Sequence, residues 1–331
     1  MSILVIGASG FIGSFIVEEA LKRGFDTWAA VRKTSSRRYL RDSRIHFLEL
    51  SFGDEDRMTE QFREHRFDYI VDAAGATKCR NSADFFRTNT EGVKVIVRAL
   101  LRSGMDLKKF VFLSSLSVYG APREKEPHED IMDTDPMMPD TAYGKSKLEA
   151  EQFLGTVKDR LNYTVLRPTG VYGPREKDYF LMVKSIKRHV DCAVGYSRQD
   201  ITFVYVTDVV AAVFLALRQE ESGNGYFITD GGVYESATFS HLVRRELGNP
   251  LCVRLVMPIF LMRAVCAFGS LWARISGKIT ALNNDKFHIL AQRNWRCDIT
   301  PARRELGYNP QVTLEEGVKR TVAWYRQEGW I

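Results

Sequence analysis

Tyr143 and Lys147 are the residues whose types and spacing best suit chemistry near neutral pH. Residues four apart on a helix lie on one face, so the lysine ammonium can act on the tyrosine hydroxyl. A phenol with a reference pKa near 10 works at pH 7 only if its phenolate is favoured by about 2 to 3 pKa units, roughly 3 to 4 kcal/mol. A partly desolvated ammonium one turn away can supply this stabilisation. The same spacing is common on solvent-exposed helices, so the pair needs support from other residues.

Support comes from Ser114, Ser115 and Ser117, which follow an apolar run at residues 110–113. The run is typical of a buried parallel strand, and open α/β sheets bind ligands just beyond the carboxyl ends of such strands. A polar, proline-bearing loop over residues 122–139 then leads to the helix with the tyrosine and lysine, and its position predicts a lid. The combination favours a proton-transfer site at the edge of a sheet.

The N-terminal stretch has the glycine spacing of a dinucleotide-binding turn. We expect a strand at residues 3–6 and a helix at residues 11–23, joined through Gly7, Gly10 and Gly13. The first glycine permits a sharp turn, the second lets the backbone approach a phosphate, and the third lets the helix lie against the strand. The helix N-terminus presents N–H groups and a positive dipole end to the anion. The residues expected to contact the dinucleotide here are Gly7, Ser9, Gly10, Phe11, Ile12 and Gly13.

Strands and helices alternate through the first half of the chain. The elements predicted from apolar runs and helical patterns are strands at residues 27–31, 45–50, 69–73 and 110–113, and helices at residues 57–65 and 83–103. This alternation indicates right-handed βαβ units. The predicted fold class is therefore α/β, with a Rossmann-type doubly wound parallel sheet.

The end of the second expected strand bears on the choice of cofactor. Folds that prefer NAD(H) place an acidic residue there to bind the ribose hydroxyls, whereas a cation accepts the 2′-phosphate of NADP(H). In this chain Val31 stands where the acidic residue would be, and Arg32 and Lys33 follow it. A guanidinium binds phosphate in bidentate fashion, so NADP(H) is favoured over NAD(H). The alternative is that these cations, with Arg37 and Arg38, only solvate a loop.

Composition bounds the class of protein. The chain has 331 residues, 27% charged and 45% hydrophobic, which is ordinary for a globular protein with a sizeable core. Five cysteines without a Cys-x-x-Cys pair indicate neither a disulfide framework nor a metal site. The net charge of +6 comes from scattered Lys and Arg, so no nucleic-acid partner is expected. The first residues lead directly into a strand without a leader pattern, which predicts a cytoplasmic protein.

Six motifs resemble, in order along the chain, those of the extended short-chain dehydrogenases/reductases. They are GASGFIG at residues 7–13, AAG at 73–75, RTNTEG at 87–92, SSLSVYG at 114–120, YGKSK at 143–147 and LRPTGVYGP at 166–174. The resemblance covers nearly the whole chain. It implies an enzyme that uses NADP(H) or NAD(H) to interconvert an alcohol and a carbonyl.

The resemblance also implies roles for individual residues. Tyr143 is similar to the family's acid/base, Lys147 to its activator and a ribose ligand, and Ser115 to the hydroxyl that polarises the substrate carbonyl. Asn89 resembles the asparagine that shapes the cofactor cleft. The remaining cofactor contacts that it implies are Ala74, Gly75, Ser114, Pro168 and Val171. One departure is Asp72, which replaces a usual histidine and is expected to affect only adenine-side details.

Two domains are implied as well. Residues 1–174 resemble the NADP-binding Rossmann domain, to which segments near 203–230 return, and residues 175–331 resemble a smaller substrate-binding domain. Residues 251–278 are far more apolar than their surroundings, but arginines keep them short of the roughly 20 apolar residues that span a bilayer. The segment is either a buried helix or an interfacial one that holds the protein at the inner membrane face. The family's usual dimer surface, which implies a homodimer, corresponds to the helices at residues 83–103 and 142–157.

Several positions bear on the reaction. Family dehydratases carry an Asp-Glu pair where this chain has Leu116 and Ser117, because removing water needs an acid and a base besides the tyrosine. Epimerases usually hold the diphosphate of a nucleotide sugar with an arginine at the position of Ile201, although Arg198 lies nearby. We therefore expect reduction of a ketone on a hydrophobic substrate, with a nucleotide-sugar epimerase or dehydratase as the alternative. Residues 295–310 and the apolar segment resemble bacterial 3-ketosphinganine and keto-ceramide reductases, and more distantly dihydroflavonol and 3β-hydroxysteroid enzymes, which implies a keto-lipid.

Overall fold

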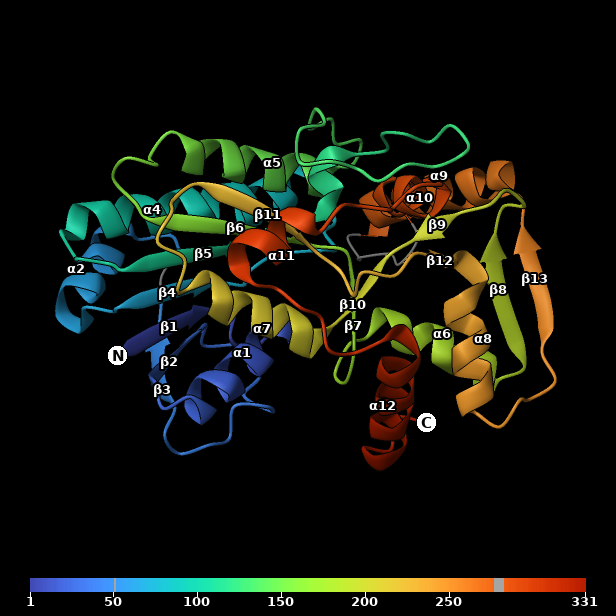
Figure 1. Ribbon diagram of the computed structural model, residues 1–331, viewed down its shortest axis with the longest axis horizontal. Helices are drawn as coiled ribbons and strands as arrows, with labels where there is room; N and C mark the ends of the chain where they lie inside the picture. Colours follow the sequence, from blue (N-terminus) through green and yellow to red (C-terminus); the bar gives the residue numbers. More distant parts are fainter. Residues whose placement is uncertain (51, 277–282) are drawn as a thin grey trace.

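The computed structural model describes residues 1–50, 52–276 and 283–331, and within them the main body is a seven-stranded parallel sheet (Figure 1). The strand order is β11-β6-β5-β4-β1-β2-β3, so the chain reverses its direction of winding beside β1. The strands of this sheet are β1 (Ser2–Ile6), β2 (Asp26–Val31), β3 (His46–Glu49), β4 (Tyr69–Asp72), β5 (Lys109–Leu113), β6 (Tyr163–Pro168) and β11 (Asn224–Ile228). The predicted fold class, a doubly wound α/β sheet, is confirmed.

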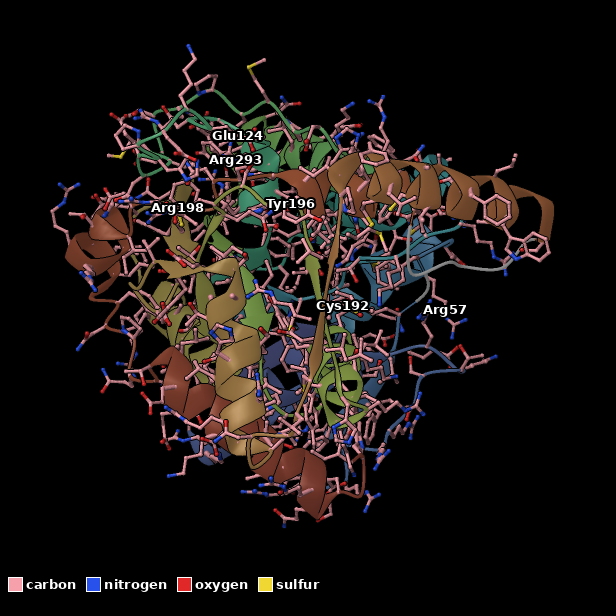
Figure 2. All side chains as sticks on the ribbon, turned by 90° about the vertical axis from the view of Figure 1, so that its right-hand side faces the viewer. Arg57, Glu124, Cys192, Tyr196, Arg198 and Arg293 are labelled. Atoms are coloured by element: carbon pink, nitrogen blue, oxygen red, sulfur yellow. The ribbon has the colours of Figure 1, made fainter. Side chains whose placement is uncertain are left out.

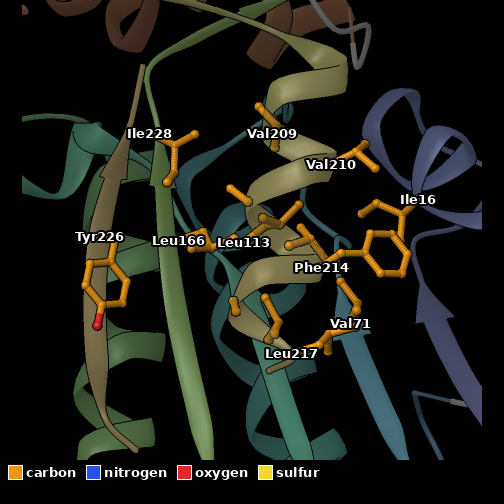
Figure 3. Close-up of a cluster of buried hydrophobic side chains, with 14 of the residues drawn as sticks. Ile16, Val71, Leu113, Leu166, Val209, Val210, Phe214, Leu217, Tyr226 and Ile228 are labelled. Atoms are coloured by element: carbon orange, nitrogen blue, oxygen red, sulfur yellow. The ribbon is translucent and has the colours of Figure 1, made fainter. Parts of the chain in front are cut away.

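Helices cover both faces of the sheet. Side chains alternate along a strand, so Ile3 and Val5 enter one core cluster and Leu4 and Ile6 enter the other. The first cluster lies under α1 (Phe11–Lys22), α7 (Val206–Ala216) and α11 (Thr300–Leu306), and the second under α2 (Glu55–His65), α4 (Gly92–Ser103) and α5 (Ala142–Gly155). Figure 3 shows the first cluster, where the side chains of α7 pack against the strands. Burial on both faces requires uninterrupted apolar strands, which explains why these strands are legible in the sequence.

The expected single helix at residues 83–103 is interrupted. The chain forms α3 (Ser82–Phe85), then a π-helical turn η1 (Phe86–Glu91), and only then α4. A π turn inserts an extra residue into helical geometry and often marks a functional position. Here it carries Asn89, whose buried side chain reaches the loop beyond β4. Periodicity within one long helix could not reveal this inserted turn.

The second half of the chain adds smaller elements beyond the carboxyl edge of the sheet. They are β7 (Gly170–Tyr172), α6 (Asp178–Lys187), β8 (Val190–Val194), β9 (Asp200–Ile201), β10 (Phe203–Tyr205), β12 (Tyr234–Glu235), α8 (Ser236–Glu246), β13 (Val253–Met257), α9 (Ile259–Ser276), α10 (Asn284–Ala291) and α12 (Leu314–Gln327). Of the segments near 203–230 that were expected to return to the Rossmann domain, β11 joins the sheet and α7 packs on its face, whereas β10 pairs with β7 in a separate ribbon.

The apolar segment 251–278 is not helical throughout. Its first part is β13, which pairs in parallel with β8 at the side of the molecule, and Pro258 separates it from α9. Its last two residues, 277 and 278, lie outside the described residues. Across the part of the chain that the structure describes, we find no helix with the length and apolar character needed to span a bilayer.

The loop at residues 122–139 is fastened in place, unlike the lid predicted from its composition. Ile131 is fully buried, and its backbone forms an isolated parallel β-bridge with that of Cys297. Asn294 donates hydrogen bonds from its side-chain amide to the carbonyl oxygens of Arg123 and Glu129, at 3.1 and 2.8 Å. Distant partners near the C-terminus satisfy the polar backbone of this loop, and local composition gave no sign of them.

Candidate active site

The first strand-to-helix turn forms a close-packed backbone cradle. Gly7 has φ +79°, and a Cβ added to it would lie 2.6 Å from the Ala74 nitrogen. A Cβ on Gly13 would lie 2.2 Å from the Gly7 carbonyl oxygen, a contact between backbone atoms that cannot relax cheaply. No side chain caps the N-terminus of α1 among the described residues, so its first N–H groups remain available to an anion.

Gly75 brings a second backbone segment to the same edge. A Cβ on Gly75 would meet the Lys147 ammonium at 3.1 Å and the Asn89 Oδ1 at 3.6 Å. Asn89 accepts a hydrogen bond from the Ala76 N–H at 2.8 Å and donates to the Ser146 hydroxyl at 3.0 Å. The asparagine therefore joins the loop after β4 to helix α5 and fixes the width of the cleft between them.

Tyr143 lies in the first turn of α5, whose N-terminus is secured twice. The Thr141 hydroxyl accepts a hydrogen bond from the Gly144 N–H at 2.9 Å. The carboxylate of Asp285, from α10, accepts from the backbone N–H groups of Ala142 and Tyr143, each at 3.2 Å. Burial raises the pKa of Tyr143, and hydrogen bonding from Ser115 offsets part of that rise. The structure thus brings Tyr143 and Ser115 together at the carboxyl end of β5.

Lys147 lies one turn further along α5, and its ammonium contacts backbone carbonyl groups at the ends of β4 and β5. It donates to the carbonyl oxygen of Leu113 at 2.8 Å and lies 3.4 Å from that of Ala74. Burial lowers the pKa of Lys147 to about 8. The expected lowering of the tyrosine pKa by this ammonium is not seen in the present arrangement, because the strand-end carbonyl groups orient the ammonium toward themselves.

Asp72 interacts with Lys147, which the sequence did not indicate, and its expected effect on the adenine side stays a prediction. It ends β4 with its side chain buried, one oxygen accepting from the Ala74 N–H at 2.9 Å and the other without a partner among the described residues. Burial raises its pKa to about 6, and the charge of Lys147 opposes that rise. In turn the Asp72 carboxylate raises the pKa of Lys147. Asp72 at the end of β4 and Lys147 on α5 therefore interact electrostatically, and no local pattern in the sequence marks this pair.

The cations after β2 line a cavity of about 480 Å³ together with Glu49 and Phe52. Arg32 and Lys33 lie there as predicted, and Arg57 of α2 joins them from a distant part of the sequence. In Figure 2, Arg57 lies at the outer edge of the molecule. Within the described part of the chain, the guanidinium groups of Arg32 and Arg57 have no hydrogen-bonding partner, which suits an anionic ligand. No sequence motif marks an arginine on a helix as a cavity residue, so the sequence alone could not place Arg57 in this cavity.

Two hydroxyl groups beyond the strand ends have no protein partner among the described residues. Ser114 follows β5 and Thr169 follows β6, and their Oγ and Oγ1 atoms are buried. Pro168 and Val171 flank Thr169 in the segment predicted to contact the cofactor. Buried hydroxyl groups normally form hydrogen bonds, so this edge offers donors and acceptors to a bound molecule.

The chain matches the model of the NAD dependent epimerase/dehydratase family over residues 3–229. It belongs to this family. A relative from Saccharomyces cerevisiae, sterol-4-alpha-carboxylate 3-dehydrogenase, decarboxylating, is 24% identical, with 98% of this chain and 97% of the relative covered. The UDP-glucose 4-epimerase of Thermotoga maritima, solved with UDP-glucose, is 26% identical with a TM-score of 0.80 and 99% of each chain covered. A dTDP-glucose 4,6-dehydratase from Streptomyces venezuelae, solved with NAD, is 22% identical with a TM-score of 0.80, and 100% and 98% of the two chains are covered.

The residues at the sheet edge fit the nicotinamide dinucleotide that membership of the family brings. The glycine turn leaves no room for side chains and exposes uncapped N–H groups to a pyrophosphate. The orphaned hydroxyl groups of Ser114 and Thr169 lie where the ligand of a doubly wound sheet is bound. The protein is therefore an NAD(P)-dependent enzyme of the extended short-chain dehydrogenase/reductase type. The roles assigned above to individual site residues remain predictions.

Proposed function

We propose that this protein reduces a ketone on a hydrophobic substrate and that NADP(H) is its cofactor. The observation that carries the proposal is the convergence of Ser115, Tyr143 and Lys147 at the carboxyl end of β5, beside the glycine cradle. Ser115 follows β5, whereas Tyr143 and Lys147 lie on α5, and none of the three is needed to complete the sheet. Such a group of titratable side chains at the carboxyl edge of a parallel sheet is typical of proton transfer.

Ser115, Tyr143 and Lys147 have different roles in the reduction of the substrate carbonyl group. Ser115 holds the substrate oxygen by a hydrogen bond, and Tyr143 donates its proton to that oxygen as negative charge develops on it. When bound, the nicotinamide supplies the hydride to the carbonyl carbon. Lys147 is charged below about pH 8. Its ammonium donates to strand-end carbonyl groups in the present arrangement, so stabilising the phenolate left on Tyr143 would require it to turn toward that oxygen. The high resting pKa of Tyr143 keeps the proton in place until the substrate oxygen needs it.

The preference for NADP(H) rests on the cavity after β2. Two guanidinium groups and the Lys33 ammonium face it, whereas Glu49 is the acidic residue in its lining. Lys33 lies 4.0 Å from Glu49 and partly neutralises it. The cavity therefore carries a net positive charge, as a 2′-phosphate requires.

Support for a hydrophobic substrate comes from two positions, Leu116 and Arg198, and from one relative. Leu116, at a position where dehydratases carry an acid, is 1% exposed and packs in the core. Arg198, the nearest candidate to hold a diphosphate, donates from Nε to Asp200 at 2.8 Å. The yeast relative is by name a sterol dehydrogenase and aligns over nearly its whole length. These observations favour an apolar keto compound, of which a long-chain keto-lipid is the example we propose.

A second candidate is a nucleotide-sugar epimerase or dehydratase. The Thermotoga maritima and Streptomyces venezuelae relatives both have that function by name, and the first was solved with its nucleotide sugar. Such relatives outnumber the sterol enzyme in this comparison. The same serine, tyrosine and lysine would hold a sugar hydroxyl and exchange its proton, while a bound nicotinamide would take up the hydride and return it.

One experiment separates the two candidates. The purified protein is mixed with NADPH or NADH and either a long-chain β-keto lipid or a short soluble ketone. In parallel it is mixed with NADP⁺ or NAD⁺ and either UDP-glucose or dTDP-glucose. The absorbance of the reduced nicotinamide and the sugar NMR spectrum are followed, with Tyr143→Phe as the control for contaminating activity. Our proposal expects net oxidation of NADPH by the keto-lipid. Conversion of a nucleotide sugar without net nicotinamide oxidation, and no ketone reduction, would establish the second candidate instead.

A further inference from the structure

Helix α9 buries one face and exposes an apolar one. Met262, Cys266 and Ala273 are at most 6% exposed and pack inward. The opposite face holds residues three or four apart along the helix, which are Phe260, Leu261, Ala264, Ala267, Phe268, Leu271 and Trp272, all exposed. The exposed fractions of Phe260 and Phe268 reach 77% and 68%. A helix on the surface of a globular protein normally shows the reverse pattern.

The ribbon before this helix continues the apolar surface. In the β8–β13 pairing, Leu255 lies opposite Cys192, and Val253 lies opposite Val190. The side chains of Cys192, Val253 and Leu255 are exposed, whereas Asp191 on the other face of the ribbon is buried and contacts Ser240. Figure 2 views this side of the molecule, with Cys192 on the ribbon and α9 along the top. We call the exposed apolar residues of β13 and α9 the outer apolar surface.

Charge around this surface has one sign. From Leu247 to Asn284 the sequence has no Asp or Glu. Arg254 and Arg263 are exposed, and Lys187 and Arg188 are exposed at the turn before β8. That turn contacts the start of β13, because His189 Nδ1 lies 2.7 Å from the carbonyl oxygen of Leu251. The Arg274 side chain lies outside the described residues.

We propose that the outer apolar surface docks on an anionic lipid bilayer. Aromatic and aliphatic side chains can enter the acyl boundary while the arginines meet anionic headgroups. A contiguous exposed apolar surface that extends over a strand and a helix is uncommon on a monomer. The rim of a protein–protein interface is normally polar, whereas this stretch has basic residues and no acidic ones, which makes it complementary to a negatively charged surface. A second copy of the chain is expected to use α4 and α5, on a different part of the molecule.

The surface adjoins the active site through α10. Asn284, at the start of α10, donates its backbone N–H to the Ser270 hydroxyl of α9 at 2.9 Å. The next residue, Asp285, accepts the N–H groups at the start of the helix that carries Tyr143. A lipid ketone drawn from the bilayer at α9 would therefore reach a cleft one helix away. This last step rests on the proposed reductase function, whereas docking itself does not.

Vesicle binding tests the docking without any substrate. The full-length protein is sedimented with phosphatidylcholine vesicles with and without phosphatidylserine. Wild type should bind the phosphatidylserine vesicles and release at high salt. Phe268→Ser/Trp272→Ser should weaken binding at least tenfold and Arg263→Glu about fivefold or more. The controls are Met138→Ser, which alters a side chain 71% exposed on the loop before α5, and Arg218→Glu, just after α7; both should bind as wild type does.

The outcomes separate docking from catalysis. The double variant should keep its melting temperature and its turnover of a short soluble ketone, but lose turnover of a vesicle-embedded keto-lipid. Absence of wild-type binding, or unchanged binding by the double variant, overturns the proposal. A change from oligomer to monomer in the double variant, seen by light scattering without wild-type vesicle binding, would assign the surface to a second copy instead. Docking with no ketone turnover would sustain this proposal and refute the proposed function.

Discussion

The carboxyl edge of the sheet, with its glycine turn, and the outer apolar surface are both rich in apolar residues, but the first region buries them and the second exposes them. We call the first region the nucleotide edge. At the edge, apolar strands are buried on both faces and the backbone turns so tightly that only glycine fits at Gly7 and Gly13. On the outer surface, β13 and α9 carry equally apolar side chains that remain exposed. The buried side chains of the strands stabilise the folded state through the hydrophobic effect. The exposed side chains of β13 and α9 add little to the free energy of folding, because they stay in contact with water. The difference separates residues that stabilise the fold from residues that we propose contact a bilayer.

The largest effect is expected from Gly13→Ala at the nucleotide edge. The new methyl group would meet the Gly7 carbonyl oxygen at 2.2 Å, and neither backbone segment can shift without breaking the turn. Affinity for NADPH should fall at least about a hundredfold, with a lower melting temperature. Calorimetric titration measures the first and thermal unfolding the second. Gly53→Ala, where no atom lies within 4 Å of the new Cβ, is the control; equal effects of the two substitutions would contradict close packing as the cause.

Tyr143→Phe should affect chemistry without affecting this edge. It removes only the hydroxyl group that donates the proton, so kcat should fall at least about a hundredfold while the Kd for NADPH stays unchanged. Steady-state kinetics and a binding titration measure the two quantities. Tyr69→Phe is matched to it, because the Tyr69 hydroxyl has only a 3.7 Å contact with the Met1 sulfur. An active Tyr143→Phe enzyme would refute the assignment of the proton donor.

Arg32→Ala tests whether the cavity after β2 selects the cofactor. Loss of a bidentate phosphate contact costs about 2 kcal/mol, so the preference for NADPH over NADH should shrink roughly thirtyfold. Arg37→Ala is the control, because that guanidinium stacks on Phe47 at 4.2 Å and does not line the cavity. The Kd values of both cofactors decide the matter. Wild-type preference for NADH would show that these cations only solvate the loop.

Asp72→Asn should change the pH dependence of turnover and little else. Lys147 is charged below its pKa of about 8, so kcat/KM should fall as the pH rises through that value. The Asp72 carboxylate favours the ammonium, and its removal should move the basic limb of the profile to lower pH, a several-fold loss of activity near pH 8. Asparagine retains an oxygen to accept the Ala74 N–H. An unchanged profile would show that Asp72 does not act on the lysine, and Asp42→Asn provides an exposed control.

The sequence revealed the parts of the molecule that depend on local rules. The strands, the glycine turn and the shared helical face of Tyr143 and Lys147 follow from periodicity and spacing. Residues brought in by distant contacts stayed hidden, because no local pattern marks them: Arg57 in the cofactor cavity and Asp285 at the start of α5 are two. The π turn at Asn89 was hidden for a different reason, since a single inserted residue barely alters a helical pattern.

The apolar segment shows where composition alone misleads. Its hydrophobicity fitted a buried helix and an interfacial one equally well, since both present apolar residues at helical spacing. Tertiary packing distinguishes the two by deciding which face of α9 is covered, and the break at Pro258 turns the first part into a strand. Exposure is a property of the whole chain, so the sequence could pose the question without answering it.

The smallest effect is therefore expected from Phe260→Ser on the outer apolar surface. Phe260 is 77% exposed, so little apolar area returns to water and the free energy of unfolding should change by no more than about 0.5 kcal/mol. Met262→Ser, two residues along the same helix, should cost about 2 to 4 kcal/mol, because that side chain is 5% exposed and contacts the Cys266 sulfur. Urea unfolding measures both. If both variants lost the same stability, the face that carries Phe260 would be covered in the native protein, and the contrast between the two regions would disappear.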